Sequence, residues 1–590
     1  MAMTHDTPAP ADASSEAATL RANLLELAGF AALAILLTWP LALRCATHLP
    51  LGQEPTDTVV VLNAWTLWWN ADRIDHGLAG YWNAPIFYPE PHTFVLGEPQ
   101  PVSGLLTWPL WHLLGMPAAY NLLLLGHLTL NGWFGRRFLR ALDVTPPADW
   151  IGGAWLASLP LVLTSLGVFQ VVPIWSVLWT LTAASRFMKQ PSRLRAAEIG
   201  IALAITYGMN CHYGLFLLSL LPLWIVGWLG HRRSGPREVA RLGTALLVFA
   251  VLVSPMLLRQ WKELRQARRK AVVVRAMSAT VPRYLHSPYL GQSREMPVRR
   301  LGIGPLKYAA AFAGVAWLWR RRERRRLCPL LLLAIGGMVL SMAPRLGYAD
   351  NSLATCLAEY VPGMGAIRNW FRYALFVQVA LVAAASMLVA ELPRCCGFIR
   401  QGRAGRCWGL AGILLLGVAE SWPGLGVLAP APPVPEWARW LGRHDRGSVL
   451  AVVPLGRGGM AVDHRRSALA MYWQPVHGCR LLNGYNGYFP DSQRTVLPAL
   501  RRLPDRTSLN VLEQAGVRYL VVYGSADEPV MRDAGWKKVL PAGADGAELW
   551  SRSSKSGSLN RRAGVSRSTR SPAASPIAAV SPARSDRDLP

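Results

Sequence analysis

About eleven long apolar runs, separated by short polar segments, constrain this chain more than any other feature. A run of roughly 20 apolar residues can cross a bilayer, and inside lipid only a helix or a closed barrel satisfies its own backbone hydrogen bonds. The sequence therefore predicts a mainly α-helical, polytopic transmembrane bundle. The predicted spans are 24–43, 119–138, 150–166, 169–187, 196–211, 213–230, 239–258, 304–319, 327–344, 371–391 and 408–428.

The charge content agrees with membrane embedding. Charged residues make up 16% of the chain, whereas about a quarter is usual in soluble proteins. The net charge of +28 would suit a nucleic-acid partner, but most arginines fall in short clusters between the apolar runs. Such clusters are typical of cytoplasmic loops. We therefore expect the lipid bilayer, and no nucleic acid, as a partner.

The basic clusters also predict the orientation. With a cytoplasmic N-terminus, the clusters at 136–140, 186–195, 231–237, 320–326 and 394–406 all fall inside. The basic segment 259–303 falls outside, and long loops translocate despite their charge. Its cations, with Arg283 and Tyr284, could bind phosphates. Equally, 259–275 could be an amphipathic helix resting on lipid headgroups.

An odd number of spans places the C-terminal part outside the membrane. Residues 448–454 and 517–524 predict buried strands, 508–516 predicts a helix, and 536–541 with 547–553 predict a hairpin. The expected organisation is a disordered cytoplasmic tail (1–22), a transmembrane domain (23–429), an extracytoplasmic α/β domain (430–552) and a disordered basic tail (553–590). Cys356 and Cys479 could meet outside, which the sequence leaves open.

The first external loop, 47–118, contains the acid Asp57 followed by a tryptophan-rich stretch. Apolar and aromatic residues recur there at helical spacing, which predicts a short helix at 62–70 lying flat in the membrane interface. These residues are Leu62, Trp65, Trp68 and Trp69. Such a helix would hold Asp57 at headgroup depth, where it could accept a proton from a hydroxyl. Alternatively, Asp57 is a solvated loop acid beside an aromatic anchor.

Arg368 and Arg372 are four residues apart at the external end of a predicted span. At that spacing they would share a helix face, beside the positive end of the helix dipole. Two arginines there could bind a phosphate, or they could snorkel to anionic headgroups.

Further polar residues are candidates for binding a sugar. Tyr207, Asn210 and His212 lie in a short external turn, and Tyr485 and Tyr488 lie in a glycine-rich stretch that could equally be a structural turn. His127 and Asn131, four apart within a span, predict an interhelical hydrogen-bonding pair.

Several segments together resemble the GT-C superfamily of membrane glycosyltransferases, within an uncharacterised bacterial branch. They are "DTVVVLNAWTLWW", "APIFYPEPHTFV", "AAYNLLLL", "MGAIRNWFRYALF", "LLNGYNGYFPDS" and "LEQAGVRYLVVY". The resemblance covers the chain except for both tails. It implies a GT-C-type bundle in the bacterial cytoplasmic (inner) membrane. It also implies that a sugar is transferred, with inversion, from a polyprenyl-phosphate donor to a glycan, lipid or protein acceptor on the outer face.

The same resemblance implies roles for individual residues. Asp57 matches the first-loop catalytic acid, and Arg368, Arg372 and Arg283 would hold the donor phosphate. Many members have an adjacent acidic pair at that point of the first loop, where this chain has Thr58.

Other acids and a metal are also in question. Glu54 is the nearest other acid, and Glu90 or Glu98 could substitute. Gln170 stands where a second external acid is expected. Some relatives use a divalent cation (Mg or Mn), for which no ligand is assigned here. The alternative function is a non-catalytic membrane protein of the same fold that binds or exports a glycan or lipid.

Overall fold

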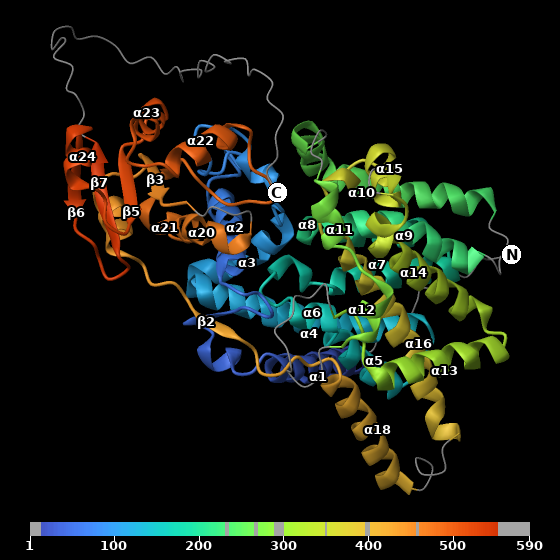
Figure 1. Cartoon of the computed structure of the whole chain (residues 1–590). Helices are drawn as coiled ribbons and strands as arrows, with labels where there is room; N and C mark the ends of the chain where they lie inside the picture. Colours follow the sequence, from blue (N-terminus) through green and yellow to red (C-terminus); the bar gives the residue numbers. More distant parts are fainter. Residues whose placement is uncertain are drawn as a thin grey trace, which may run out of the picture. The chain divides into compact units, whose positions relative to one another are not determined.

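Helices make up most of the chain in the computed structural model (Figure 1). The structure describes residues 13–229, 235–264, 269–287, 300–348, 351–395, 402–455 and 460–552. The predicted tail at 553–590, residues 1–12, and residues 265–268 and 288–299 of the basic loop lie outside the described residues. Helix α1 begins at Ala13, so the prediction of a disordered segment is wrong for residues 13–22.

Six helices of the described chain are long and apolar enough to cross a membrane, which supports a multi-pass membrane protein. They are Thr19–Leu37, Phe169–Lys189, Cys211–Leu229, Arg237–Glu263, Arg324–Arg345 and Trp370–Leu392. The other predicted spans are helices that fall short of that length or hydropathy, so the count of eleven remains a prediction.

The helices that build the bundle and its external segments are α1 (Ala13–Leu37), α2 (Thr58–Asp75), α3 (Pro101–Leu114), α4 (Met116–Ala141), α5 (Ala148–Ala157), α6 (Pro160–Thr164), α7 (Trp175–Lys189), α8 (Arg193–Met209), α9 (Cys211–Leu229), α10 (Pro236–Leu264), α11 (Ala271–Ala276), α12 (Val281–Leu285), α13 (Pro305–Arg320), α14 (Arg324–Met342), α15 (Leu353–Tyr360), α16 (Ala374–Cys395) and α18 (Gly402–Ala419).

Three predicted segments differ from the structure. The span at 150–166 is two short helices, α5 and α6, because the chain breaks before Pro160, which has no N–H to continue a helix. This run is apolar because protein buries it on all sides. The span at 408–428 ends as helix α18 at Ala419. A single amphipathic helix over 259–275 is also wrong, because α10 ends at Leu264 and α11 begins at Ala271.

The predicted interhelical pair is confirmed. The Nδ2 of Asn131 on α4 donates to the carbonyl of Val172 at 2.9 Å, and its Oδ1 accepts from the backbone N–H of Trp175 at 2.8 Å. The Trp175 indole donates to His127 Nδ1 at 3.1 Å. Both polar side chains are fully buried, so these bonds fix α4 against the start of α7.

A five-stranded mixed sheet forms the C-terminal part, with strand order β4-β3-β5-β7-β6. Strand β3 (Val449–Val453) is parallel to β4 (Arg480–Leu481) and β5 (Tyr519–Tyr523). Strand β7 (Ala547–Arg552) is antiparallel to β5 and β6 (Trp536–Leu540), so the predicted strands and hairpin are confirmed. The helices of this part are α19 (Glu436–His444), α20 (Arg465–Tyr472), α21 (Gln474–His477), α22 (Ser492–Leu500), α23 (Arg506–Gln514) and α24 (Glu528–Asp533).

The C-terminal part packs on the first external loop. Strand β1 (His48–Pro50) pairs with β2 (Leu428–Pro430), and α2 lies against α20. The backbone of Leu481 donates to Pro85 and accepts from Tyr88, each at 2.9 Å. Residues Met1–Arg552 form one compact unit, and a domain boundary at 430 remains a prediction.

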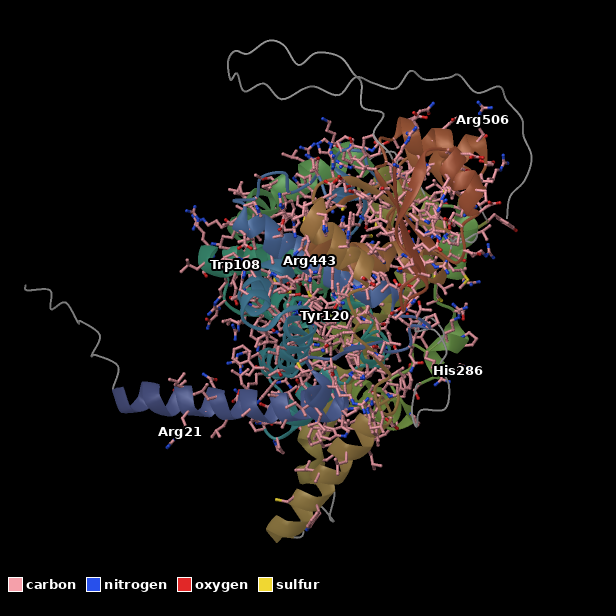
Figure 2. The ribbon with its side chains drawn as sticks, turned by 90° about the vertical axis from the view of Figure 1, so that its left-hand side faces the viewer. Arg21, Trp108, Tyr120, His286, Arg443 and Arg506 are labelled. Atoms are coloured by element: carbon pink, nitrogen blue, oxygen red, sulfur yellow. The ribbon has the colours of Figure 1, made fainter. Side chains whose placement is uncertain are left out.

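The tryptophans of α2 are buried by protein, not by lipid. Trp65, Trp68 and Trp69 are 1%, 9% and 4% exposed, and the Trp65 indole donates to Gln474 Oε1 at 2.6 Å. A helix forms as predicted, but its placement flat in the interface is wrong, because the C-terminal part covers its apolar face. Helix α3 exposes apolar side chains instead, including Trp108 at the surface (Figure 2).

The two cysteines considered for a disulfide do not pair. Cys356 on α15 is exposed, Cys479 before β4 is buried, and both are free thiols. The Cys479 thiol lies 3.7 Å from the carbonyl of Asp445, within the C-terminal part.

Candidate functional site

Asp57 is engaged in an ion pair. It stands immediately before α2, and its two carboxylate oxygens accept hydrogen bonds from Arg465 Nε at 2.6 Å and Nη2 at 2.9 Å. Hydrogen bonding to Asp57 raises the pKa of Arg465. Since Asp57 is only 8% exposed, it is not a solvated loop acid either. Its geometry suits attachment of α20 to the first loop better than proton transfer.

Glu54, three residues earlier, has a different environment. The residue is half-buried, and within the described chain its carboxylate has no hydrogen bond or ion pair. Burial raises the pKa of Glu54 above its ordinary value of 4.5, while the positive charges of Arg372 and Arg368 act in the opposite direction. An unpaired carboxylate with a raised pKa beside two arginines is suited to accepting a proton.

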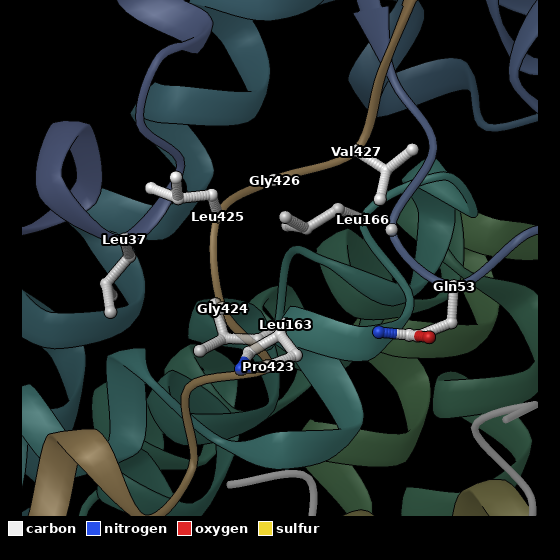
Figure 3. Close-up of a pocket in the computed structure, with 10 residues that line it drawn as sticks. Leu37, Gln53, Leu163, Leu166, Pro423, Gly424, Leu425, Gly426 and Val427 are labelled. Atoms are coloured by element: carbon white, nitrogen blue, oxygen red, sulfur yellow. The ribbon is translucent and has the colours of Figure 1, made fainter. Parts of the chain in front are cut away.

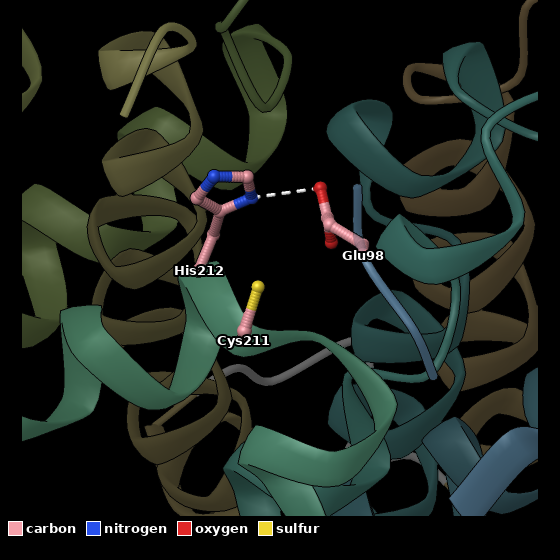
Figure 4. A group of neighbouring side chains, drawn as sticks. All are labelled: Glu98, Cys211 and His212. Carbon is pink, nitrogen blue, oxygen red and sulfur yellow. Dashed lines mark ion pairs between the residues drawn. The ribbon is translucent and has the colours of Figure 1, made fainter. Parts of the chain in front are cut away.

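A second acid, Glu98, is held in a polar cluster just before α3. His212 Nδ1 lies 2.8 Å from Glu98 Oε1 (Figure 4), and Arg372 Nη1 lies 3.7 Å from the same oxygen. Burial favours the neutral acid, but His212, Arg372 and a hydrogen bond with Gln170 outweigh it and hold the pKa of Glu98 well below its usual range. Glu98 is therefore a fixed negative charge that positions Arg372.

Arg368 and Arg372 do not share a helix face as predicted. The chain at 367–369 is irregular, and Arg372 lies in a 3₁₀ turn, Trp370–Tyr373, that precedes α16. Arg368 is exposed and Arg372 is 6% exposed. The positive charges of both nevertheless act on the Glu54 carboxylate and lower its pKa.

The loop at 483–489 of the C-terminal part lies over this cluster. The hydroxyl of Tyr488 donates to the carbonyl of Ala366 at 3.0 Å, and the guanidinium of Arg269 lies 3.5 Å from the Tyr488 ring centre. Tyr485 stacks on His464 at 5.1 Å. Burial raises the pKa of Tyr485, the positive charge of Arg368 lowers it, and the negative charge of Glu54 raises it.

Gly97 allows the same loop to approach. A Cβ at Gly97 would lie 1.9 Å from Asn486 Oδ1, and the Asn486 side chain donates to the carbonyl of Thr93 at 3.2 Å. The close contact between these two segments therefore depends on the absence of a side chain at position 97.

The remaining predicted site residues have structural partners. The hydroxyl of Tyr207 donates to Gln260 at 2.6 Å, Arg283 donates to the carbonyl of Ser278 at 2.7 Å, and the hydroxyl of Tyr284 lies 2.7 Å from that of Ser341. Asn210, between α8 and α9, donates to the carbonyl of Gln170 at 2.7 Å. Of the predicted residues Tyr207, Asn210 and His212, the last is thus the one whose side chain lies in the polar cluster with Glu98.

One group of side chains could hold a metal ion. Ligand atoms of Glu98, Cys211 and His212 lie within 4.8 Å of one another (Figure 4). One oxygen, one nitrogen and one sulfur suit zinc, whereas magnesium and manganese prefer oxygens. The charge of Arg372 on the same carboxylate opposes a cation. This group therefore does not suit Mg or Mn, and a divalent cation stays a prediction.

A small cavity of about 240 Å³ adjoins the first loop (Figure 3). Leu37 at the end of α1, Leu163, Leu166 and the segment 423–427 line it together with Gln53. The cavity thus lies between the first loop, at Gln53, and the segment that follows α18.

From the sequence, Glu54 is only the nearest other acid to Asp57, and Glu98 is one of two possible substitutes for a missing acid. The signal that separates them from Asp57 is spatial. Both lie close to Arg372, which is more than 270 residues away in the chain, whereas Asp57 faces Arg465.

Comparison with known proteins supports the fold. No protein-family model matches the sequence, and neither does any curated protein. The chain is similar to the cryo-EM structure of the arabinofuranosyltransferase AftD from Mycobacteria, with a TM-score of 0.54 and 17% identity over 90% of this chain and 40% of that chain. A point mutant of AftD gives a TM-score of 0.57 at 17% identity, covering 90% of this chain and 41% of that one.

A further match is to ArnT from Cupriavidus metallidurans in the apo state, with a TM-score of 0.47 and 12% identity over 90% of this chain and 98% of that chain. The chain spans about two fifths of the length of AftD. At these identities the likeness to AftD shows the fold alone, and for the fold it confirms the predicted resemblance to GT-C glycosyltransferases.

Proposed function

We propose that this chain is an integral-membrane glycosyltransferase that moves a sugar from a polyprenyl-phosphate donor to a hydroxyl of a glycan, lipid or protein. The observation that carries the proposal is the unpaired, half-buried carboxylate of Glu54 beside Arg368 and Arg372. The GT-C fold and the apolar helices support it.

In this proposal Glu54 is the general base. It takes the proton of the acceptor hydroxyl as the oxygen attacks the anomeric carbon of the donor sugar. The bond from that carbon to the phosphate oxygen breaks on the opposite face, which inverts the configuration. A pKa raised above its ordinary value makes Glu54 a better proton acceptor than Glu98, whose pKa is lowered by His212 and Arg372.

The two arginines stabilise the leaving phosphate. Arg372 is buried, and its Nη1 has no hydrogen bond within the described part of the chain, so this donor is available to a phosphate oxygen. Arg368 is exposed, and its guanidinium N–H groups can donate further hydrogen bonds to the same phosphate. Glu98 and His212 act through Arg372 and are positioning residues.

Glu54→Gln tests the proposal, with Glu90→Gln as a matched control. Glu90 lies in the same loop and makes no ion pair with either arginine in the structure. A general base contributes about 10²- to 10⁴-fold to the rate, so Glu54→Gln should lower transfer by about 100-fold or more while Glu90→Gln leaves it unchanged. The assay is transfer from a panel of polyprenyl-phosphate sugars by protein reconstituted in lipid.

The outcomes separate the alternatives. Normal transfer by Glu54→Gln would exclude Glu54 as the base. If the wild type transfers no sugar from the panel yet binds the polyprenyl phosphate, the non-catalytic function in binding or export gains instead.

A further inference from the structure

A basic pocket lies at the opposite ends of the membrane-crossing helices from the candidate site. Three candidate spans end there, through Lys189, Trp228 and Arg324, and together these residues line a cavity of about 630 Å³. His212 and Trp228 are at the two ends of α9, so the rise of a helix places them about 24 Å apart along its axis. The pocket therefore lies at the other membrane surface, the one predicted to be cytoplasmic.

The acids of the pocket are already neutralised. Asp143 pairs with Lys189 at 2.6 Å and with Arg326 at 3.6 Å, and Arg326 also pairs with Glu323 at 3.0 Å. Each acid thus has at least one cation, and Lys189 and Arg326 are both occupied.

Three arginines remain uncompensated. Arg322, Arg324 and Arg325 line the pocket, are exposed, and make no ion pair with any residue that the structure describes. Helix α14 begins at Arg324, and Glu323 before it makes no side-chain cap. The free N–H groups and the positive dipole end of a 19-residue helix therefore add to the three positive charges.

Aromatic side chains border these charges. Trp228 is 8% exposed and forms part of the pocket wall, and Trp319, one turn before Arg322, is 72% exposed. Trp319 is at the end of the predicted span 304–319, and an exposed indole at the end of a span is typical of headgroup depth. Charges for a phosphate thus adjoin apolar surface suited to the glycerol and upper acyl carbons of a lipid.

We propose that this pocket binds the headgroup of an anionic phospholipid. The phosphodiester lies among Arg322, Arg324 and Arg325, and the lipid body lies against Trp228 and Trp319. Three uncompensated arginines suit a lipid with two phosphates better than one with a single phosphate. This inference concerns a separate surface and does not depend on the proposed transfer reaction.

The test compares two double variants in the same basic segment. Arg324→Gln with Arg325→Gln removes two pocket charges, and Arg320→Gln with Arg321→Gln removes the same charge from the adjoining residues, which do not line the pocket. Full-length protein in neutral detergent is titrated with cardiolipin, phosphatidylcholine or inorganic phosphate. Bound lipid is followed by native mass spectrometry and thermal melting.

Cardiolipin should bind and raise the melting temperature of the wild type and of the control variant. In the pocket variant its affinity should fall by about 30-fold, since each arginine near a lipid phosphate contributes about one factor of five. Equal loss in both variants would overturn the proposal, because net charge would then explain binding. A shift of equal size with inorganic phosphate would overturn the assignment to a lipid.

Discussion

The pair between Asp57 and Arg465 offers the clearest test of the reassigned site. The Asp57 side chain is 9% exposed and that of Arg465 is 48% exposed. A hydrogen bond to a charged group contributes about 1.5–3 kcal/mol, and exposure of one partner reduces such values toward about 1 kcal/mol. We therefore expect Arg465→Gln or Asp57→Asn to lower the free energy of local opening of α20 by about 1–2 kcal/mol.

Amide hydrogen exchange measures this opening directly. A loss of one or two kcal/mol corresponds to a factor of about 5 to 30, so the amides of α20 and of the first turn of α2 should exchange faster by that factor. The double variant should exchange no faster than either single variant, because both changes remove the same interaction. Amides of β6, the edge strand farthest from β3 and β4 in the strand order, provide the internal control.

One result would refute the reasoning. If Asp57→Asn abolished sugar transfer while exchange in α20 stayed at the wild-type rate, Asp57 would act in the chemistry and not in docking. Conversely, transfer that survives Asp57→Asn at a reduced melting temperature agrees with a structural pair.

Three further predictions concern the polar cluster. Because the pKa of Glu54 is raised above 4.5, the rate of transfer should fall as the pH drops through that pKa. The charge of Arg372 lowers the pKa of Glu54, so Arg372→Gln should raise this pKa and move the acid limb of the pH–rate profile to higher pH. An unmoved limb would separate Glu54 from the proton transfer. Gly97→Ala overlaps Asn486 and should cost about 1–3 kcal/mol in thermal stability, which the added change Asn486→Ala should restore. His212 and Arg372 lower the pKa of Glu98 to about 2, against the effect of burial. The ion pairs of Glu98 therefore contribute their full stability above pH 4.5 and lose it as the pH falls through about 2. The melting-temperature difference between the wild type and Glu98→Gln should therefore shrink as the pH falls toward 2, and a difference independent of pH would contradict the pairing.

Local patterns predicted much of the C-terminal sheet. The apolar runs at 449–453 and 519–523 are short, β-branched and bounded by turn residues, so their strand character is visible without any partner. The helix before β5 has its own signals, with Asp505 capping its start and Gly516 following its end.

Tertiary contacts decided the parts that the sequence could not predict. The apolar face of α2 has the composition of an interfacial helix, but periodicity cannot distinguish lipid from protein as the partner, and here Gln474 and α20 cover it. In the same way, the run at 150–166 is apolar because protein surrounds it. Asp57 and Glu54 look equivalent in the sequence, and only the positions of Arg465 and Arg372 separate a docking acid from an unpaired one.

The two-stranded ribbon between β1 and β2 has a consequence for how the C-terminal part stays in place. It pairs residues 48–50 with residues 428–430, so the chain enters the C-terminal part from a point that is fixed beside the first loop. A short connection of this kind keeps the loop at 483–489 at an effective concentration in the millimolar range near its docking surface. A few hydrogen bonds, among them the Tyr488 hydroxyl on Ala366, the Tyr488 N–H on Leu96 and Asn486 on Thr93, are then sufficient to hold the loop, and it could release without moving far from that surface.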